Sequence, residues 1–144
     1  MTEVTVANAH PRKRVAGAAL VRLLRSVLAG EKTRNVRLSL VLIDRHRCRR
    51  INERFLGHRF ETDVLSFPLE SAPRLEGEVY VNLDRAATQA RHYEVTFGNE
   101  VARLAVHGTL HLLGYDDRRA ADSRRMKAAE ERYVALAKRA GKTP

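Results

Sequence analysis

Two histidines one helical turn apart, His107 and His111, constrain the fold of this chain more than any other feature of its sequence. Residues i and i+4 of an α-helix lie on the same face with Cβ atoms roughly 5–6 Å apart, so two imidazoles can reach one metal ion. Gly114 follows the second histidine at a distance where a helix can end in a left-handed turn, which can bring Asp117 toward the same ion. Two nitrogens and one carboxylate leave a coordination position open, as in catalytic zinc sites.

The spacing also permits a simpler interpretation, because paired histidines occur as ordinary helix residues. The pattern H-x-x-x-H-x-x-G-x-x-D parallels the extended motif of zinc proteases. Those proteases need a glutamate directly after the first histidine as general base, and this chain has Gly108 there. The sequence therefore predicts a metal site without the peptidase base, and metal-assisted hydrolysis of a different bond or with a different base.

An excess of positive charge indicates a polyanionic partner. The chain has 27 Lys+Arg against 17 Asp+Glu, a formal net charge of +10. Nucleic acid is the simplest such partner, although a solvated basic surface explains the same composition. In the last predicted helix, the basic residues that we expect to follow a nucleic-acid backbone are Arg118, Arg119, Arg124 and Arg125.

Length and hydrophobic content predict one compact domain over residues 1–144. Hydrophobic residues make up 44% of the chain, which is enough for a core and argues against a disordered protein. The single cysteine, Cys48, excludes an intramolecular disulfide, and its basic neighbours suit either a reactive thiol or simply a packed or surface residue. Because Arg22 and Arg25 interrupt the first apolar stretch, we expect no signal peptide, no membrane span and a cytoplasmic protein.

Hydrophobic periodicity predicts a mixture of strands and helices. The expected strands are 2–7, 36–43, 63–67 and 77–82, the third ended by Pro68 and placed at a sheet edge or strand end. The expected helices are 15–28, a segment through 54 capped by Asp44, 83–93, a segment from Thr96 or Asn99 to 112, and 117–139. Since helices flank the strands without strict alternation, we expect an α+β fold with a small mixed β-sheet flanked by helices.

Residues 107–117 resemble the signature of the YbeY-type rRNA maturation endoribonucleases, H-G-x-x-H-x-x-G-Y-D-H, at ten of eleven positions. The segment 62–68 is similar to the family's strand motif, and 75–79 is a weakened form of its L-G-D-I block. Glu100 also stands where the family usually has glutamate. The blocks follow the family's order over roughly residues 35–120.

The resemblance implies a mixed sheet, surrounding helices and an open cleft with one metal on a central helix. The metal is usually taken as zinc, with His107, His111 and Asp117 in the ligand positions. It further implies a single-strand-specific endoribonuclease that processes ribosomal RNA, especially the 3′ end of the small-subunit RNA, and acts in ribosome quality control. The implied partners are ribosomal RNA and the small ribosomal subunit with its proteins.

Two positions depart from the family's pattern. Asp117 stands where the family usually has histidine. A carboxylate can bind zinc at about 2.0–2.2 Å, but its charge makes the metal a weaker Lewis acid. The neighbouring Asp116 is an alternative ligand or an orienting group. Leu56 takes the place of an arginine that is thought to bind or activate the phosphate.

Three residues near Leu56 are candidates to replace that arginine as catalytic cations, namely Arg54, His58 and Arg59. An arginine can clamp a phosphate through two parallel hydrogen bonds, whereas a solvated basic loop is the alternative interpretation. Two other functions compete with the nuclease. The first is a non-catalytic ribosome-assembly factor that keeps the metal for structure, and the second is a zinc hydrolase of another substrate.

Overall fold

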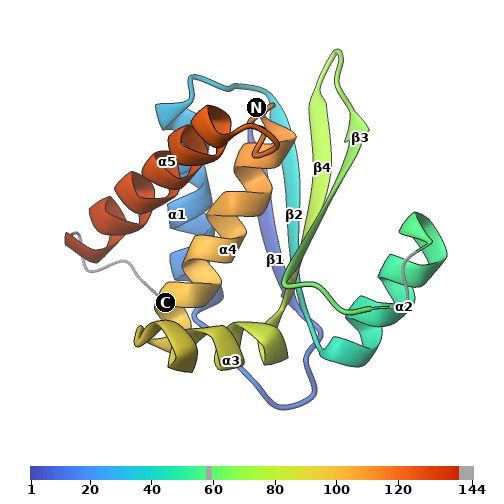
Figure 1. Cartoon of the computed structure of the whole chain (residues 1–144). Coiled ribbons are helices and arrows are strands. Elements are labelled where there is room, and N and C mark those ends of the chain that lie inside the picture. The colour runs from blue at the N-terminus through green and yellow to red at the C-terminus, as the bar shows by residue number, and fades with distance from the viewer. Residues whose placement is uncertain (58–59, 140–144) are drawn as a thin grey trace.

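The computed structural model describes residues 1–57 and 60–139 and contains a four-stranded mixed sheet with helices around it (Figure 1). The strands are β1 (Glu3–Asn8), β2 (Val36–Ile43), β3 (Val64–Glu70) and β4 (Leu75–Asn82), and the helices are α1 (Gly17–Gly30), α2 (Arg45–Leu56), α3 (Leu83–Tyr93), α4 (Phe97–Leu112) and α5 (Ala120–Arg139). The predicted α+β fold is thereby confirmed. None of the helices in the described ranges is both long and apolar enough to cross a membrane.

The strand order is β1-β2-β4-β3, with β1, β2 and β4 parallel and β3 antiparallel to β4. The edge position predicted for the third strand is confirmed, but Pro68 does not end it. At an edge, the missing N–H of proline costs no ladder hydrogen bond, so β3 continues to Glu70 with an irregularity after Pro68. This edge strand lies beside α4 and forms one wall of the site described below.

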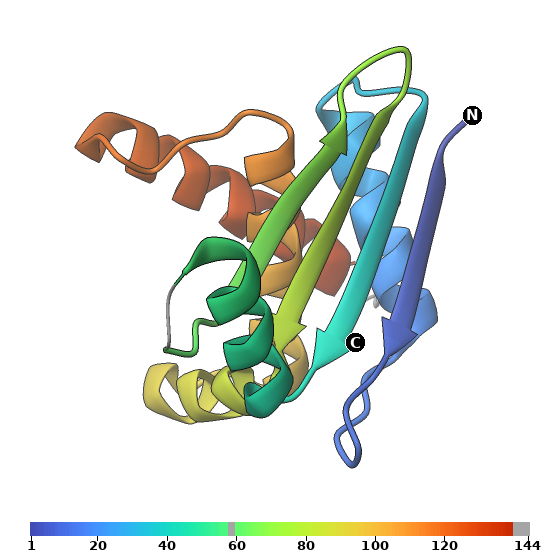
Figure 2. The ribbon, with the colours of Figure 1, turned by 90° about the vertical axis from the view of Figure 1, so that its right-hand side faces the viewer.

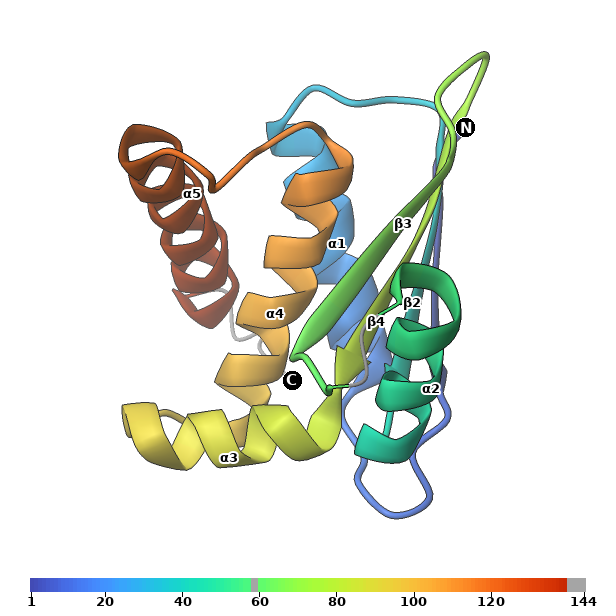
Figure 3. The same cartoon turned by 45° about the vertical axis from the view of Figure 1, so that its right-hand side comes forward.

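The helices form layers on the two faces of the sheet. Figure 3 shows α1 and α4 on one face and α2 on the other, and Figure 2 shows α2 in front of the strands. Helix α5 packs on the outer side of α4 and α1, and α3 lies across one end of the sheet (Figure 1). The main core fills the space between the sheet and α1, α4 and α5, where fully buried side chains include Leu20, Leu24, Leu40, Val79, Leu104 and Leu110.

Helix α4 begins after Thr96, whose hydroxyl accepts a hydrogen bond from the Asn99 amide at 3.0 Å. This cap decides between the two predicted starting points. Most of the helix is buried, so its position is determined by packing on the sheet, α1, α3 and α5. The histidine pair therefore sits on one of the most constrained elements of the molecule.

The helix after β2 begins as predicted, because the Asp44 side chain accepts a hydrogen bond from the Arg47 amide at 2.8 Å. Its Cys48 is 1% exposed, and the thiol donates to the Thr62 carbonyl at 3.3 Å. Burial raises the pKa of this thiol. The packed interpretation of Cys48 is therefore correct and the reactive one is wrong.

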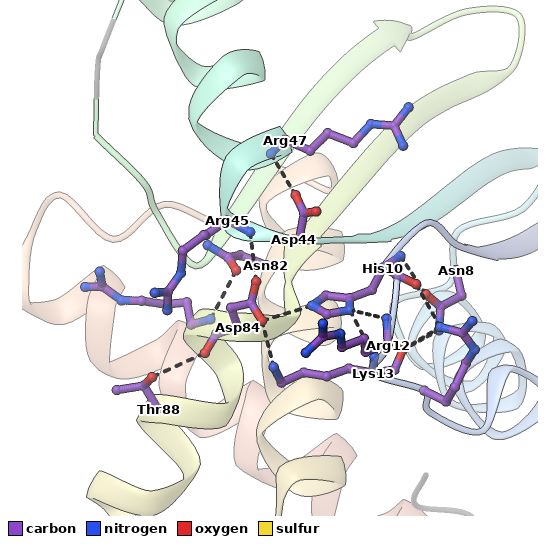
Figure 4. A network of polar contacts seen from close by, with 12 residues as sticks. Asn8, His10, Arg12, Lys13, Asp44, Arg45, Arg47, Asn82, Asp84 and Thr88 are labelled. Atoms are coloured by element: carbon purple, nitrogen blue, oxygen red, sulfur yellow. Dashed lines mark hydrogen bonds and ion pairs between the residues drawn. The ribbon is translucent and has the colours of Figure 1, made fainter.

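A polar network joins α3 to the loop after β1 and to the start of α2 (Figure 4). The carboxylate of Asp84 accepts from Lys13 Nζ at 2.7 Å, from His10 Nε2 at 2.9 Å and from the Arg45 amide at 3.0 Å. Burial alone would raise the pKa of Asp84, but the bonds from Lys13, His10 and Arg45 outweigh burial and hold that pKa well below its usual range. The network fixes the end of the sheet from which α3 leads into α4.

Candidate metal centre

His107 and His111 project from one face of α4, as their spacing predicts. Their Nε2 atoms lie 3.1 Å apart, and the rings meet edge to face with centroids 4.7 Å apart. The side chains are 22% and 32% exposed, so both imidazoles reach the surface from a helix that is mostly buried. Two nitrogen ligands are thus held side by side at an open face.

The turn after α4 brings a carboxylate to the histidines. Gly114 has φ +101°, a left-handed conformation that favours glycine, and the Gly114 amide bonds the His111 carbonyl at 3.1 Å. Asp117 Oδ2 then lies 3.7 Å from His111 Nε2, and all three ligand atoms lie within 4.8 Å of one another. Asp116 instead accepts from the Arg118 amide at 2.9 Å. The structure therefore brings together Asp117, not Asp116, with the two histidines.

The same turn corrects the predicted start of the last helix. The sequence places that start at Asp117, but α5 begins at Ala120. The Asp116 side chain bonds the Arg118 amide and Asp117 is directed toward His111, so these residues form an irregular turn rather than helix.

Glu31, at the end of α1, anchors the turn. Its carboxylate accepts hydrogen bonds from the hydroxyls of Tyr115, at 2.8 Å, and Tyr133. Burial, together with the negative charge of Glu31, raises the pKa of both tyrosines, so the hydroxyls remain protonated donors. Because Tyr115 lies two residues before Asp117, this contact fixes the path along which the third ligand approaches.

Glu130 of α5 forms a hydrogen bond with His107 on the side of the ring that faces away from His111. It is 4% exposed, and its Oε2 accepts from Nδ1 of His107 at 2.6 Å. With the Nδ1 proton directed at a carboxylate, Nε2 of His107 keeps its lone pair for a metal. The contact therefore gives His107 the tautomer and ring orientation that a ligand needs.

A chain of buried polar groups holds Glu130 in turn. Arg103 donates to Glu130 Oε1 at 3.3 Å and to Glu100 at 2.7 and 3.0 Å. Glu100 is 1% exposed and also accepts from Gln89 at 2.7 Å. Hydrogen bonding to Glu100 raises the pKa of Arg103 further above its ordinary value, so the guanidinium stays positively charged between the two buried glutamate side chains.

The donor set and its spacing fit one divalent ion. Ligands about 2.0–2.2 Å from a tetrahedral ion are about 3.3–3.6 Å from one another. The measured separations of 3.1 Å between the two Nε2 atoms and 3.7 Å between His111 and Asp117 lie on either side of this range. Two imidazoles and one carboxylate also leave a tetrahedral position open, which suits a catalytic rather than a structural role.

The close packing of α4 on the sheet requires glycine at position 108 and leaves no room there for the glutamate base of the zinc proteases. A Cβ atom at this position would lie 2.5 Å from Val79 Cγ1 and 3.0 Å from Ser66 Oγ. The Ser66 hydroxyl donates to the Gly108 carbonyl at 2.9 Å, so α4 approaches the sheet closely here. A glutamate at this position would point into the sheet and could not reach the metal centre.

Two hollows border the centre, and both are open to solvent. One lies on the β3 side, measures about 550 Å³, and has polar wall residues that include Thr62, Asp63 and Ser66. The other lies between α3, α4 and α5 and measures about 360 Å³. His107 and Asp117 line both hollows, so these two candidate ligands lie where the hollows meet. The site is an open cleft on a central helix, as predicted.

The structure describes one of the three predicted catalytic cations, Arg54, and does not place it at the metal centre. His58 and Arg59 lie outside the described residues. Arg54 is exposed on α2, with its guanidinium carbon 5.5 Å from the centre of the Phe55 ring, and it lines neither hollow. Leu56 is 48% exposed near the end of the same helix. The roles of these cations stay predictions.

Sequence reasoning missed Glu130 and Arg103, the residues that hold His107. Glu130 belongs to the buried stripe of α5 that also contains Met126, Tyr133 and Val134. A glutamate within an apolar stripe needs a buried partner, which was the available signal. The basic residues of this region, Arg118, Arg119, Arg124 and Arg125, are all exposed, and their contact with a nucleic-acid backbone stays a prediction.

The fold and the site together define a class: α+β proteins with one candidate metal centre on a helix packed against a mixed sheet. The chain belongs to the endoribonuclease YbeY family, whose family model matches residues 5–138. This membership confirms the resemblance seen in the sequence motifs.

Individual relatives agree with the family assignment. The chain is 37% identical to the Endoribonuclease YbeY of Salinibacter ruber over 140 residues, covering 91% of this chain and 89% of that protein. It is 36% identical over 125 residues to the Endoribonuclease YbeY of Chlorobium phaeovibrioides, covering 87% and 84%. The solution structure of TM1509 from Thermotoga maritima matches with a TM-score of 0.65 and 27% identity, covering 94% of this chain and 89% of that one.

Proposed function

We propose that this protein is a metal-dependent endoribonuclease that cuts single-stranded RNA, with one Zn²⁺ held by His107, His111 and Asp117. The observation that carries the proposal is the cluster of three ligand atoms within 4.8 Å of one another beside an open cleft. The relatives are named endoribonucleases, which supports RNA as the substrate. The net charge of +10 independently favours a polyanion.

Zinc suits this donor set because it binds imidazole nitrogen and carboxylate oxygen in a tetrahedral arrangement. Held by these residues with one position open, zinc would supply Lewis-acid chemistry, either by activating a water or by polarising a phosphoryl oxygen. Asp117 adds negative charge to the ligand set, so we expect weaker polarisation than three neutral imidazoles would allow.

The protein's own groups orient the reaction. Glu130 accepts the Nδ1 proton of His107, and Arg103 holds Glu130 in place by donating to its other oxygen. For the cation that stabilises charge on the phosphate we retain Arg54, His58 and Arg59 as candidates. The last two precede Thr62, which lines the cleft beside His107.

We infer that the RNA supplies its own nucleophile. In this reaction the 2′-oxygen of the ribose attacks the adjacent phosphorus, and the bond from phosphorus to the 5′-oxygen breaks. The 2′-proton is lost and the leaving 5′-oxygen gains one, so the products carry a 2′,3′-cyclic phosphate and a 5′-hydroxyl. DNA lacks the 2′-hydroxyl and would not be cut.

The cellular role proposed here follows from the family resemblance. We propose that the enzyme acts in the cytoplasm on ribosomal RNA, in particular at the 3′ end of the small-subunit RNA, and in ribosome quality control. Its partners are the small ribosomal subunit and its proteins. The exposed arginines that follow Asp117, namely Arg118, Arg119, Arg124 and Arg125, support contact with an RNA backbone.

A non-catalytic ribosome-assembly factor is the second candidate function. The observation that favours it is Leu56, a half-exposed apolar side chain at the position where the family usually has arginine. Such a protein would bind zinc and RNA without cutting the RNA.

The deciding experiment incubates zinc-loaded protein with a labelled single-stranded RNA, its DNA counterpart and the RNA duplex, and identifies the product ends by mass spectrometry. We expect cleavage of the single-stranded RNA alone, with 2′,3′-cyclic or 3′-phosphate ends. RNA binding without cleavage would decide for the assembly factor. Cleavage that leaves 3′-hydroxyl ends would contradict attack by the 2′-hydroxyl.

A further inference from the structure

Metal binding does not account for the hollow between α3, α4 and α5, although this hollow opens directly onto the candidate metal centre. Its volume is about 360 Å³, and His107 and Asp117 form the side that it shares with the β3-side hollow. Figure 1 shows α4 standing between α5 and β3, so the two hollows flank this helix. A polymer lying across α4 at the ligands would extend into both.

The walls of this hollow offer flat apolar contact. Tyr93, the last residue of α3, is 57% exposed at the rim, and Val95 beside it is 38% exposed. Met126 closes the floor from α5. An exposed aromatic ring next to a partly apolar hollow is the arrangement on which proteins stack unpaired nucleobases.

The polar groups of the hollow suit a neutral, hydrogen-bonding guest. The side-chain amide of Asn99 offers a donor and an acceptor and bonds no other described residue. Four carboxylates line the walls, those of Glu100, Asp117, Glu130 and Glu131, against the two cations Arg103 and Lys127. This balance disfavours a phosphate, whereas a base carries no charge and can hydrogen-bond with the amide of Asn99 and the carboxylate of Glu131.

We propose that this hollow receives one unpaired nucleobase of the RNA, adjacent to the phosphate that is cut. The inference rests on the proposed function and deepens it. The base stacks on Tyr93 and hydrogen-bonds with Asn99, while its phosphate stays outside, at the metal ligands. A base in this hollow has left any duplex, which gives the enzyme a physical reason to require single strands.

The test uses an RNA oligonucleotide whose cleavage position has been mapped, with a 2′-deoxy nucleotide at that position to prevent cutting. An abasic residue is moved one position at a time across the site, and the Kd is measured for the zinc-loaded wild type and for Tyr93→Ala. We expect one abasic position to weaken binding by the wild type about tenfold, within the range for one stacked base. In Tyr93→Ala the same abasic position should cause a much smaller loss, because only the hydrogen bonds with Asn99 remain to be removed.

Two controls and one specificity variant complete the design. Tyr93→Phe keeps the ring and should retain the abasic effect, and Leu136→Ala truncates an exposed side chain elsewhere on α5 and should bind like the wild type. Asn99→Ala should change the preference among the four bases at the sensitive position while leaving binding of the abasic RNA unchanged.

Each contrary result is informative. Binding and cleavage of RNA with no sensitive abasic position would overturn the base site and leave the nuclease intact. An abasic effect that is as large in Tyr93→Ala as in the wild type would place the base elsewhere. If the zinc-loaded wild type neither binds nor cleaves RNA, both the proposed function and this inference are overturned.

Discussion

Replacing Glu130 with glutamine should weaken zinc binding while leaving the metal ligands themselves unchanged. In the wild type, one oxygen of Glu130 accepts from His107 Nδ1 at 2.6 Å and the other accepts from Arg103 at 3.3 Å. Glutamine offers one oxygen and one NH₂ group, so in either orientation a donor faces a donor and one of these bonds is lost. The negative charge beside His107 is lost as well.

The expected loss is about 10- to 100-fold in zinc affinity, the usual effect of removing a group that orients a metal-binding histidine. This corresponds to about 1.4–2.7 kcal/mol. The assay is a competition titration of the metal-free protein against a chromophoric zinc chelator. Asp122→Asn is the matched control, because it removes a carboxylate from the same helix without touching the centre.

The reasoning fails if Glu130→Gln binds zinc as tightly as Asp122→Asn and the wild type do. That result would make Glu130 a structural partner of Arg103 alone. The thermal unfolding temperature of each metal-free variant is measured as a control, because partial unfolding would lower the apparent zinc affinity for an unrelated reason.

Three further outcomes are expected. Gly108→Ala should lower the free energy of unfolding by about 1–3 kcal/mol in a denaturant titration, because its Cβ would lie 2.5 Å from Val79 Cγ1. Asp84→Asn should lower the free energy of unfolding by about 2 kcal/mol at pH 7. Hydrogen bonds lower the pKa of Asp84 in the folded state, so the ionised carboxylate stabilises the fold above the pKa that Asp84 has in the unfolded chain. This stabilisation fades as the pH falls below about 4. Replacing Arg119 and Arg124 together by glutamine should reduce the salt dependence of RNA binding by about two units of log-log slope, measured by fluorescence anisotropy.

These outcomes have specific contradictions. If adding Val79→Ala to Gly108→Ala restores none of the lost stability, the close approach of α4 to the sheet is not the cause. An Asp84→Asn effect that stays constant from pH 7 down to pH 3 would mean that the ionised carboxylate is not the stabilising form. An unchanged salt slope would place the RNA backbone away from these arginines.

The sequence predicts the proposed ligand set because the geometry of these three residues is local. His107 and His111 are one turn apart on a helix, and Gly114 permits the turn that carries Asp117 to them. The segment 36–43 is also predicted with its observed bounds, because a run of apolar and β-branched residues suits a central strand, one face of which is fully buried in the core.

What the sequence does not reveal depends on contacts between distant elements. Glu130 lies 23 residues from His107 on another helix, and only the packing of α5 on α4 brings them together. The order β1-β2-β4-β3 places the fourth strand between the second and the third, which no local pattern specifies. The hollow beside Tyr93 likewise exists only once α3, α4 and α5 are assembled.

The most direct test of the central claim is a zinc titration of RNA cleavage by metal-free protein, with His111→Ala and the exposed-histidine control His46→Ala prepared in parallel. The account predicts that activity of the wild type and His46→Ala rises to a plateau at one zinc per chain, and that His111→Ala stays inactive. Equal activity of His111→Ala, or cleavage that does not depend on added zinc, would contradict the assignment of this centre as the site of reaction.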